Sequence, residues 1–266
     1  MRWALIGWLL AWGATAASAA DFLVESKVIL NPKEAVNSTT VFQGAVTYDF
    51  LTSPAEITVF DAPHKRFVIL DLDRRVKVEL GTDEIDAFNQ RLKSNAQERN
   101  VPLLSFLAEP TFDERWDEAA GELTMSSNWM SYLVKTTEAK QEDAVSRYSA
   151  YSAWQAKLNT VIRPGSFPPF ARLLLNAALE KHDRLPVEVE LTRYAQNPIK
   201  RQLTIRAQHR WQWRLLDRDL KRVEEANNHL VTFEAVSLPE YLKRAVQQEA
   251  NSSAQAPAAA EDGEKR

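Results

Sequence analysis

The sequence contains no cysteine and little glycine or histidine. Without cysteine, thiol catalysis, a disulfide framework, thiolate metal sites and the acylated cysteine of a bacterial lipoprotein are excluded. Seven glycines are spread over 266 residues, and those in the mature part lie too far apart to form a loop around a phosphate. The histidines are scattered too and supply no paired metal-binding motif; they are His64, His182, His209 and His229. We therefore expect no metal site and no cofactor.

The rest of the composition is typical of a soluble globular protein. Hydrophobic residues make up 45% of the chain and charged residues 26%, and the formal net charge of −3 gives no general attraction to nucleic acid. Residues 250–266 contain no aromatic or branched aliphatic side chain, which predicts a disordered tail. No linker or internal repeat divides residues 21–249, so we expect a single domain there.

Residues 1–20 have the pattern of a secretory signal peptide. Arg2 is followed by an apolar run, and small residues then form a cleavage site that places the cut near Ala19 or Ala20. The apolar run is shorter than the roughly 20 residues that a membrane-spanning helix needs. We therefore expect a periplasmic or secreted protein that has neither a lipid tether nor a stable membrane insertion after cleavage.

Hydrophobic periodicity predicts an α+β fold. The expected strands and hairpins are 22–30, 40–51, 56–60, 67–80, 122–138, 186–194, 203–216 and 230–235. Helices are expected at 142–162, 217–228 and 239–247 and beginning at Thr82 and Pro168, with a loop-rich stretch at 101–121. Together these segments predict a curved antiparallel sheet of seven to nine strands, an incomplete β-barrel, covered on one side by four or five helices.

A row of arginines alternates along 203–216. Arg206, Arg210 and Arg214 share one face of this strand, and either an anionic partner or cross-strand pairing explains them. A hairpin with 186–194 places Glu190 opposite Arg206, which favours a solvated outer face with paired charges.

The opposite face of the same strand carries His209, Trp211 and Trp213. Two alternating tryptophans either fill a core or line an apolar cavity, and His209 is a hydrogen-bond partner for a buried indole. We take these three residues, with Trp129 and Tyr132, as the candidates for lining a ligand site.

The signal for catalysis is weak, and we predict no catalytic residue. The turn of the 67–80 hairpin explains Asp73, and an arginine neighbour accounts for Asp71. No serine lies in a G-x-S-x-G or S-x-x-K context.

The segment GAVTYDFLTSPAEITVFDAPHKRFVILDLDRRVKVEL (44–80), followed by the helix from Thr82, resembles the periplasmic lipoprotein-carrier (LolA-like) superfamily, and the likeness extends to ELTMSSNWMSYLVK (122–135). The block 167–192 is similar to segments of uncharacterised exported bacterial proteins. The resemblance is one of layout, and it implies a half-barrel whose concave apolar face holds acyl chains. It identifies no functional residue.

The expected function is that of an exported, non-enzymatic protein that binds a lipid or other apolar ligand in the concave face of its sheet. The first alternative is a structural or interaction protein of the cell envelope with a filled core and no ligand. The second is a hydrolase whose acid/base pair comes from carboxylates far apart in the chain. An apolar cavity of about 300 Å³ or more favours ligand binding.

Overall fold

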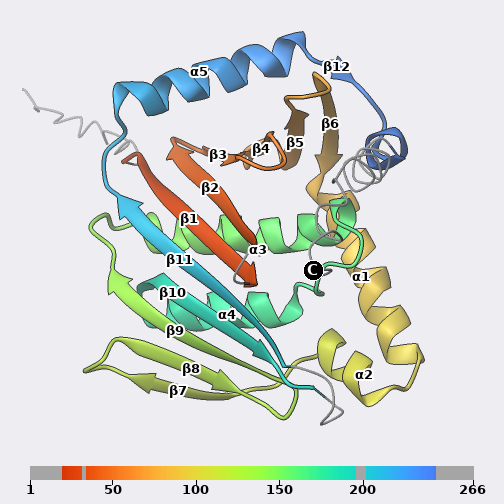
Figure 1. Cartoon of the computed structure of the whole chain (residues 1–266), viewed down its shortest axis with the longest axis vertical. Coiled ribbons are helices and arrows are strands. Elements are labelled where there is room, and N and C mark those ends of the chain that lie inside the picture. The colour runs from red at the N-terminus through yellow and green to blue at the C-terminus, as the bar shows by residue number, and fades with distance from the viewer. Residues whose placement is uncertain (1–19, 32–33, 196–201, 244–266) are drawn as a thin grey trace, which may run out of the picture.

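The computed structural model describes residues 20–31, 34–195 and 202–243. The predicted signal peptide, apart from Ala20, and the predicted tail at 250–266 lie outside these residues. The described chain forms an α+β fold built on one open, mixed sheet (Figure 1).

The sheet has twelve strands in the order β12-β6-β5-β4-β3-β2-β1-β11-β10-β9-β8-β7. The strands are β1 (Phe22–Asn31), β2 (Glu34–Gln43), β3 (Val46–Leu51), β4 (Glu56–Asp61), β5 (Arg66–Asp71), β6 (Val76–Gly81), β7 (Asp113–Asp117), β8 (Glu122–Ser126), β9 (Met130–Glu138), β10 (Arg184–Arg193), β11 (Leu203–Gln212) and β12 (Glu234–Ala235). Strand β1 lies between β2 and β11, so the first strand of the chain joins the early and late parts of the sheet.

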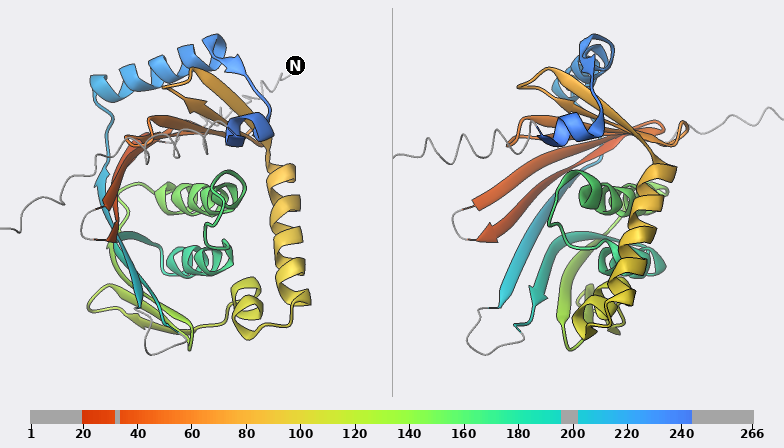
Figure 2. Two further views of the ribbon diagram at one scale, coloured as in Figure 1. Left: turned by 45° about the vertical axis from the view of Figure 1, so that its right-hand side comes forward. Right: turned by 90° about the vertical axis from the view of Figure 1, so that its right-hand side faces the viewer.

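Helices lie on both faces of this sheet. They are α1 (Thr82–Glu98), α2 (Pro102–Ala108), α3 (Ala144–Ile162), α4 (Phe170–Lys181) and α5 (Asp217–Thr232). A further helix is described at 238–243, and it overlaps the predicted helix 239–247, whose last residues lie outside the described chain. Figure 2 shows α3 and α4 side by side on one face, which we call the inner face, and α5 across the opposite, outer face. No helix in the described part of the chain is long and apolar enough to cross a membrane.

Strand alternation explains why the early strands need helices on both faces. In β5, Phe67 and Ile69 belong to a core cluster with residues of α3, whereas Val68 and Leu70 belong to a second cluster with residues of α5. Successive side chains of a strand point to opposite faces, so a continuous apolar run such as FVIL requires cover on each side. The prediction of helices on one side is therefore corrected: α5 covers the other side.

The late strands have a third core beneath α4. Leu123 on β8, Val134 on β9 and Val189 on β10 pack with Leu175 and Leu179 of α4. Outward-facing residues of β10 and β11 are polar, as a half-solvated antiparallel sheet requires.

Two predicted hairpins are confirmed. Strands β5 and β6 pair Phe67 with Leu80 and Ile69 with Val78, and the turn lies between residues 71 and 76. Strands β8 and β9 pair around the predicted turn at Ser127, whose hydroxyl donates to the Met130 carbonyl at 2.8 Å.

Other parts of the strand prediction were wrong. The segment 40–51 is not one strand but the end of β2, a turn with Gly44 at a φ of +53°, and β3. The stretch 101–121 contains α2 and the edge strand β7. Helix α5 continues to Thr232, which leaves only β12 from the predicted strand at 230–235, and β12 pairs with β6 in parallel. The sheet is consequently mixed and has more strands than expected.

Candidate ligand-binding site

A cavity of about 350 Å³ lies between the inner face of the sheet and the segment that connects α3 to α4. Four neighbouring strands form its floor. Ala207 on β11 pairs with Val28 on β1 and with Val189 on β10. In the next row, Leu191 on β10 pairs with Ile205 on β11 and with Tyr132 on β9. The floor is thus a continuous apolar surface.

The roof of the cavity comes from α3, α4 and the loop between them. Ala156 and Asn159 lie one helical turn apart on α3, and Phe167 and the two prolines that follow it line the loop side. Ala156 above and Ala207 below are small residues at positions where larger side chains would fill the space. The cavity therefore results from the small side chains of Ala156 and Ala207 and from the proline-containing loop that leads into α4.

Most residues that line this cavity are apolar, Asn159 and Ser166 are polar, and Arg172 is the one charged residue among them. Arg172, in the first turn of α4, donates from Nε to Asn176 Oδ1 at 3.0 Å and from Nη2 to the Tyr148 hydroxyl at 3.0 Å and to Ser152 Oγ at 3.1 Å. All three acceptors are uncharged. The cavity thus has an apolar floor, and we call the part at Arg172, near Tyr148, its polar end.

His209 lies next to this polar end, one inward-facing position beyond Ala207 on β11. Its Nδ1 is 2.8 Å from Ser26 Oγ on β1, and its ring packs edge-to-face on Tyr148 with 6.4 Å between centroids. Burial lowers the pKa of His209 to about 3, and the positive charge of Arg172 acts in the same direction. Among the described residues, Nε2 of His209 has no hydrogen-bond partner. The histidine is consequently neutral at pH 7.

The lowered pKa of His209 predicts an acid-sensitive stability. Below about pH 6.5 the unfolded chain protonates this histidine and the folded protein does not, so the free energy of unfolding falls as the pH falls towards 3. We expect the free energy of unfolding, measured with urea, to fall between pH 7 and pH 5 by about 2 kcal/mol more in the wild type than in His209→Gln. The pKa of Asp49, which burial raises, changes stability in the opposite direction and does so in both proteins. An equal fall in the free energy of unfolding in the two proteins would show that the pKa of His209 is not lowered.

The five residues that the sequence predicted to line a ligand site lie in different parts of the structure. Tyr132 lines the cavity. His209 does not line it: its ring contacts Tyr148 near the polar end, and it is one of the residues that line a separate groove across β2, β1 and β11. Trp211 and Trp213 do not line it: their rings are 6.1 Å apart and pack against Phe22 in the core beneath α3. Trp129 packs on Phe106 in the core beneath α4. Sequence reasoning missed Arg172, whose signal was an arginine and an asparagine four residues apart in an otherwise apolar segment.

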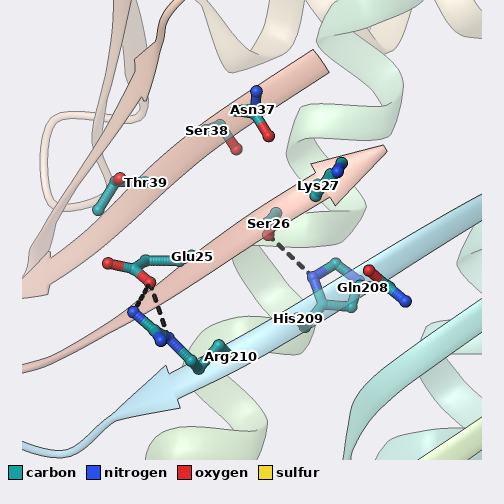
Figure 3. A pocket seen from close by; sticks show the side chains of 9 residues that line it. All are labelled: Glu25, Ser26, Lys27, Asn37, Ser38, Thr39, Gln208, His209 and Arg210. Atoms are coloured by element: carbon teal, nitrogen blue, oxygen red, sulfur yellow. Dashed lines mark hydrogen bonds and ion pairs between the residues drawn. The ribbon is translucent and has the colours of Figure 1, made fainter. Parts of the chain in front are cut away.

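Two arginines of the predicted row, Arg206 and Arg210, lie on the outer face and are paired, whereas Arg214 lies beyond the end of β11. Arg206 contacts Glu190 at 2.7 Å and Arg210 contacts Glu25 at 2.6 Å, which confirms the predicted cross-strand placement of Glu190. A groove of about 500 Å³ runs here across β2, β1 and β11, and Figure 3 shows the Glu25–Arg210 pair within it. Its polar lining includes Ser26, Lys27 and His209, and it does not suit an apolar ligand.

Three carboxylates are buried on the inner face near α3, and each has a partner in the fold. Asp49 accepts a hydrogen bond from Thr40 Oγ1 at 2.7 Å, and Asp71 is held by Arg74, also at 2.7 Å. Glu56 is held by Arg163 Nη2 at 2.7 Å and by the Tyr241 hydroxyl. These contacts account for the three groups as structural residues.

The described residues contain no cluster of three or more His, Asp or Glu side chains arranged to hold a metal ion. No protein-family model matches the chain, and no curated protein matches it.

Proposed function

We propose that this protein is an exported, non-enzymatic protein that binds the acyl chain of a lipid in the cavity between α3, α4 and strands β1, β9, β10 and β11. The observation that carries the proposal is the cavity itself, which has about 350 Å³ of space and an apolar floor built from four strands. Cavities of this size and character are typical of sites for small apolar ligands. The signal-peptide pattern at 1–20 supports a periplasmic or secreted location.

We also propose that the sheet acts as an incomplete barrel around α3 and α4, as the resemblance to the lipoprotein-carrier superfamily implies. The strand order supports this, because β12 and β7 lie at opposite ends of the sheet and do not pair. An unclosed barrel gives an acyl chain access to its inner face without opening a strand pair.

The alternative, a structural or interaction protein with a filled core, is favoured by one observation. Phe22, Phe42, Tyr151, Trp211 and Trp213 occupy the inner face beneath the first half of α3. Only the part of the inner face beyond Ala207 therefore remains for a ligand.

Binding of alkyl chains tests the proposal. We expect the protein to bind both an alkanoate series and the matching 1-alkanols, measured by calorimetric titration below their micelle concentrations. Each buried methylene contributes about 0.8 kcal/mol, so each step of two carbons should tighten binding roughly tenfold until the cavity is full. A protein that binds neither series has no acyl-chain site, and the filled-core alternative would then stand.

A further inference from the structure

Arg172 is a charged side chain without an opposite charge. No ion pair among the described residues includes it, although ion pairs are common elsewhere in the fold. Its three hydrogen-bond acceptors are neutral, and its Nη1 makes no hydrogen bond to a described residue. A partly buried cation is costly unless a charged partner compensates it, so this guanidinium is suited to an anion that enters the cavity.

A second observation, next to this end of the cavity, points to a ligand. The buried Nε2 of His209 has no partner among the described residues, and His209 packs on Tyr148, which is itself bonded to Arg172. Buried polar atoms in folded proteins are nearly always satisfied, and an unsatisfied one calls for an explanation. A guanidinium that lacks a counter-ion thus lies close to a second unsatisfied group, with Tyr148 in contact with both.

The other end of the cavity has leucines at the surface, beside Arg193 of β10, which pairs with Leu203 and whose guanidinium lies 5.9 Å from the centre of the Phe167 ring. Beyond Val28 and Ile205, the next inward-facing residues of β1 and β11 are Leu30 and Leu203. These leucines are 40% and 38% exposed, respectively. An alkyl chain that leaves the cavity at this end would cover both.

We propose that the ligand is a single-chain amphiphile with a free carboxylate, bound with the carboxylate at Arg172 and the alkyl chain running past Ala207 and Ile205 to Leu30 and Leu203. This inference rests on the proposed acyl-chain function and specifies the ligand class and its direction. A guanidinium presents paired N–H groups that match the two oxygens of a carboxylate. A single arginine with neutral neighbours balances one negative charge.

Head-group preference tests the inference. Dodecanoate and its methyl ester should be titrated into wild type, Arg172→Met and the matched outer-face control Arg206→Met. We expect wild type and the control to bind dodecanoate roughly 10- to 100-fold more tightly than the ester, because a hydrogen-bonded charged group contributes that much. Arg172→Met should bind the two ligands about equally, and Arg172→Lys should recover part of the preference.

The outcomes separate the two proposals. Equal affinity of wild type for dodecanoate and its ester would overturn the carboxylate inference and leave the acyl-chain function standing. Binding of neither ligand, nor of any alkanol, would overturn the proposed function. The wild-type comparison needs no variant, so the test holds even if Arg172→Met fails to fold.

The direction of the chain has its own test. In Leu203→Ser, we expect the affinity gain between decanoate and dodecanoate to shrink, while the gain between hexanoate and octanoate stays as in wild type. The opposite pattern would place the carboxylate at the leucine end and contradict the proposed direction.

Discussion

Replacing Ala207 with phenylalanine is expected to weaken dodecanoate binding by about 100-fold or more. The methyl group of Ala207 forms the centre of the cavity floor, between Val28 and Val189 on the neighbouring strands. A phenyl ring there occupies the path of the alkyl chain. Excluding four methylenes from the cavity removes about 3 kcal/mol of binding free energy, which corresponds to a loss of that size.

This substitution should leave the fold nearly unchanged. Overpacking a filled core costs about 1 to 3 kcal/mol, but here the added ring enters existing space, so we expect the free energy of unfolding to change by less than about 1 kcal/mol. Ala177→Phe is the matched control, because Ala177 is an exposed residue of α4 that does not line the cavity. If Ala207→Phe binds dodecanoate as the control does, the ligand lies elsewhere.

Replacing Trp211 with alanine is expected to have the opposite effect, a large loss of stability without a specific loss of binding. The indole packs edge-to-face on Tyr148 with 5.1 Å between centroids and contacts Phe22, and its Nε1 donates to the Pro186 carbonyl at 2.9 Å. Removing a tryptophan from such a core leaves a void and an unpaired carbonyl. We expect the free energy of unfolding to fall by about 3 kcal/mol.

Urea unfolding measures this loss, and titration with dodecanoate at a temperature where the variant stays folded measures binding. An affinity within about threefold of wild type is expected, because Trp211 does not line the cavity. A Trp211→Ala protein that keeps its stability but loses the ligand would place the binding site beneath the tryptophans and contradict our assignment.

The elements that the sequence predicted best are those with strong local signals. Alternating apolar residues and a polar turn were sufficient to predict the β5–β6 hairpin, including the pairing of Phe67 with Leu80. The sequence predicted only the second half of β2, because the first half of this strand is polar. It did not predict α2, because a helix of seven residues that begins with a proline has too little helical periodicity. The position of α5 on the outer face depends on long-range packing of Val223 and Phe233, which local patterns do not encode.

The binding site was harder to predict because what defines a cavity is the absence of side-chain volume. Trp211, on β11, and Trp213, just after it, were predicted to line the site. Large side chains fill space, however, and these two pack in the core. The cavity forms where Ala156 and Ala207 leave room, and two alanines 51 positions apart produce no sequence signal. Arg172 is distinctive only once the structure shows that its neighbours are uncharged.

The most direct test of the cavity as a ligand site is to locate a bound acyl chain by NMR. With uniformly ¹³C-labelled dodecanoate in complex with the protein, we predict nuclear Overhauser contacts from the alkyl chain to the Tyr132 ring and to the methyl groups of Ala156 and Ala207. Contacts to the rings of Trp211 and Trp213 without any to these three residues would contradict the account, as would a spectrum in which the dodecanoate remains free.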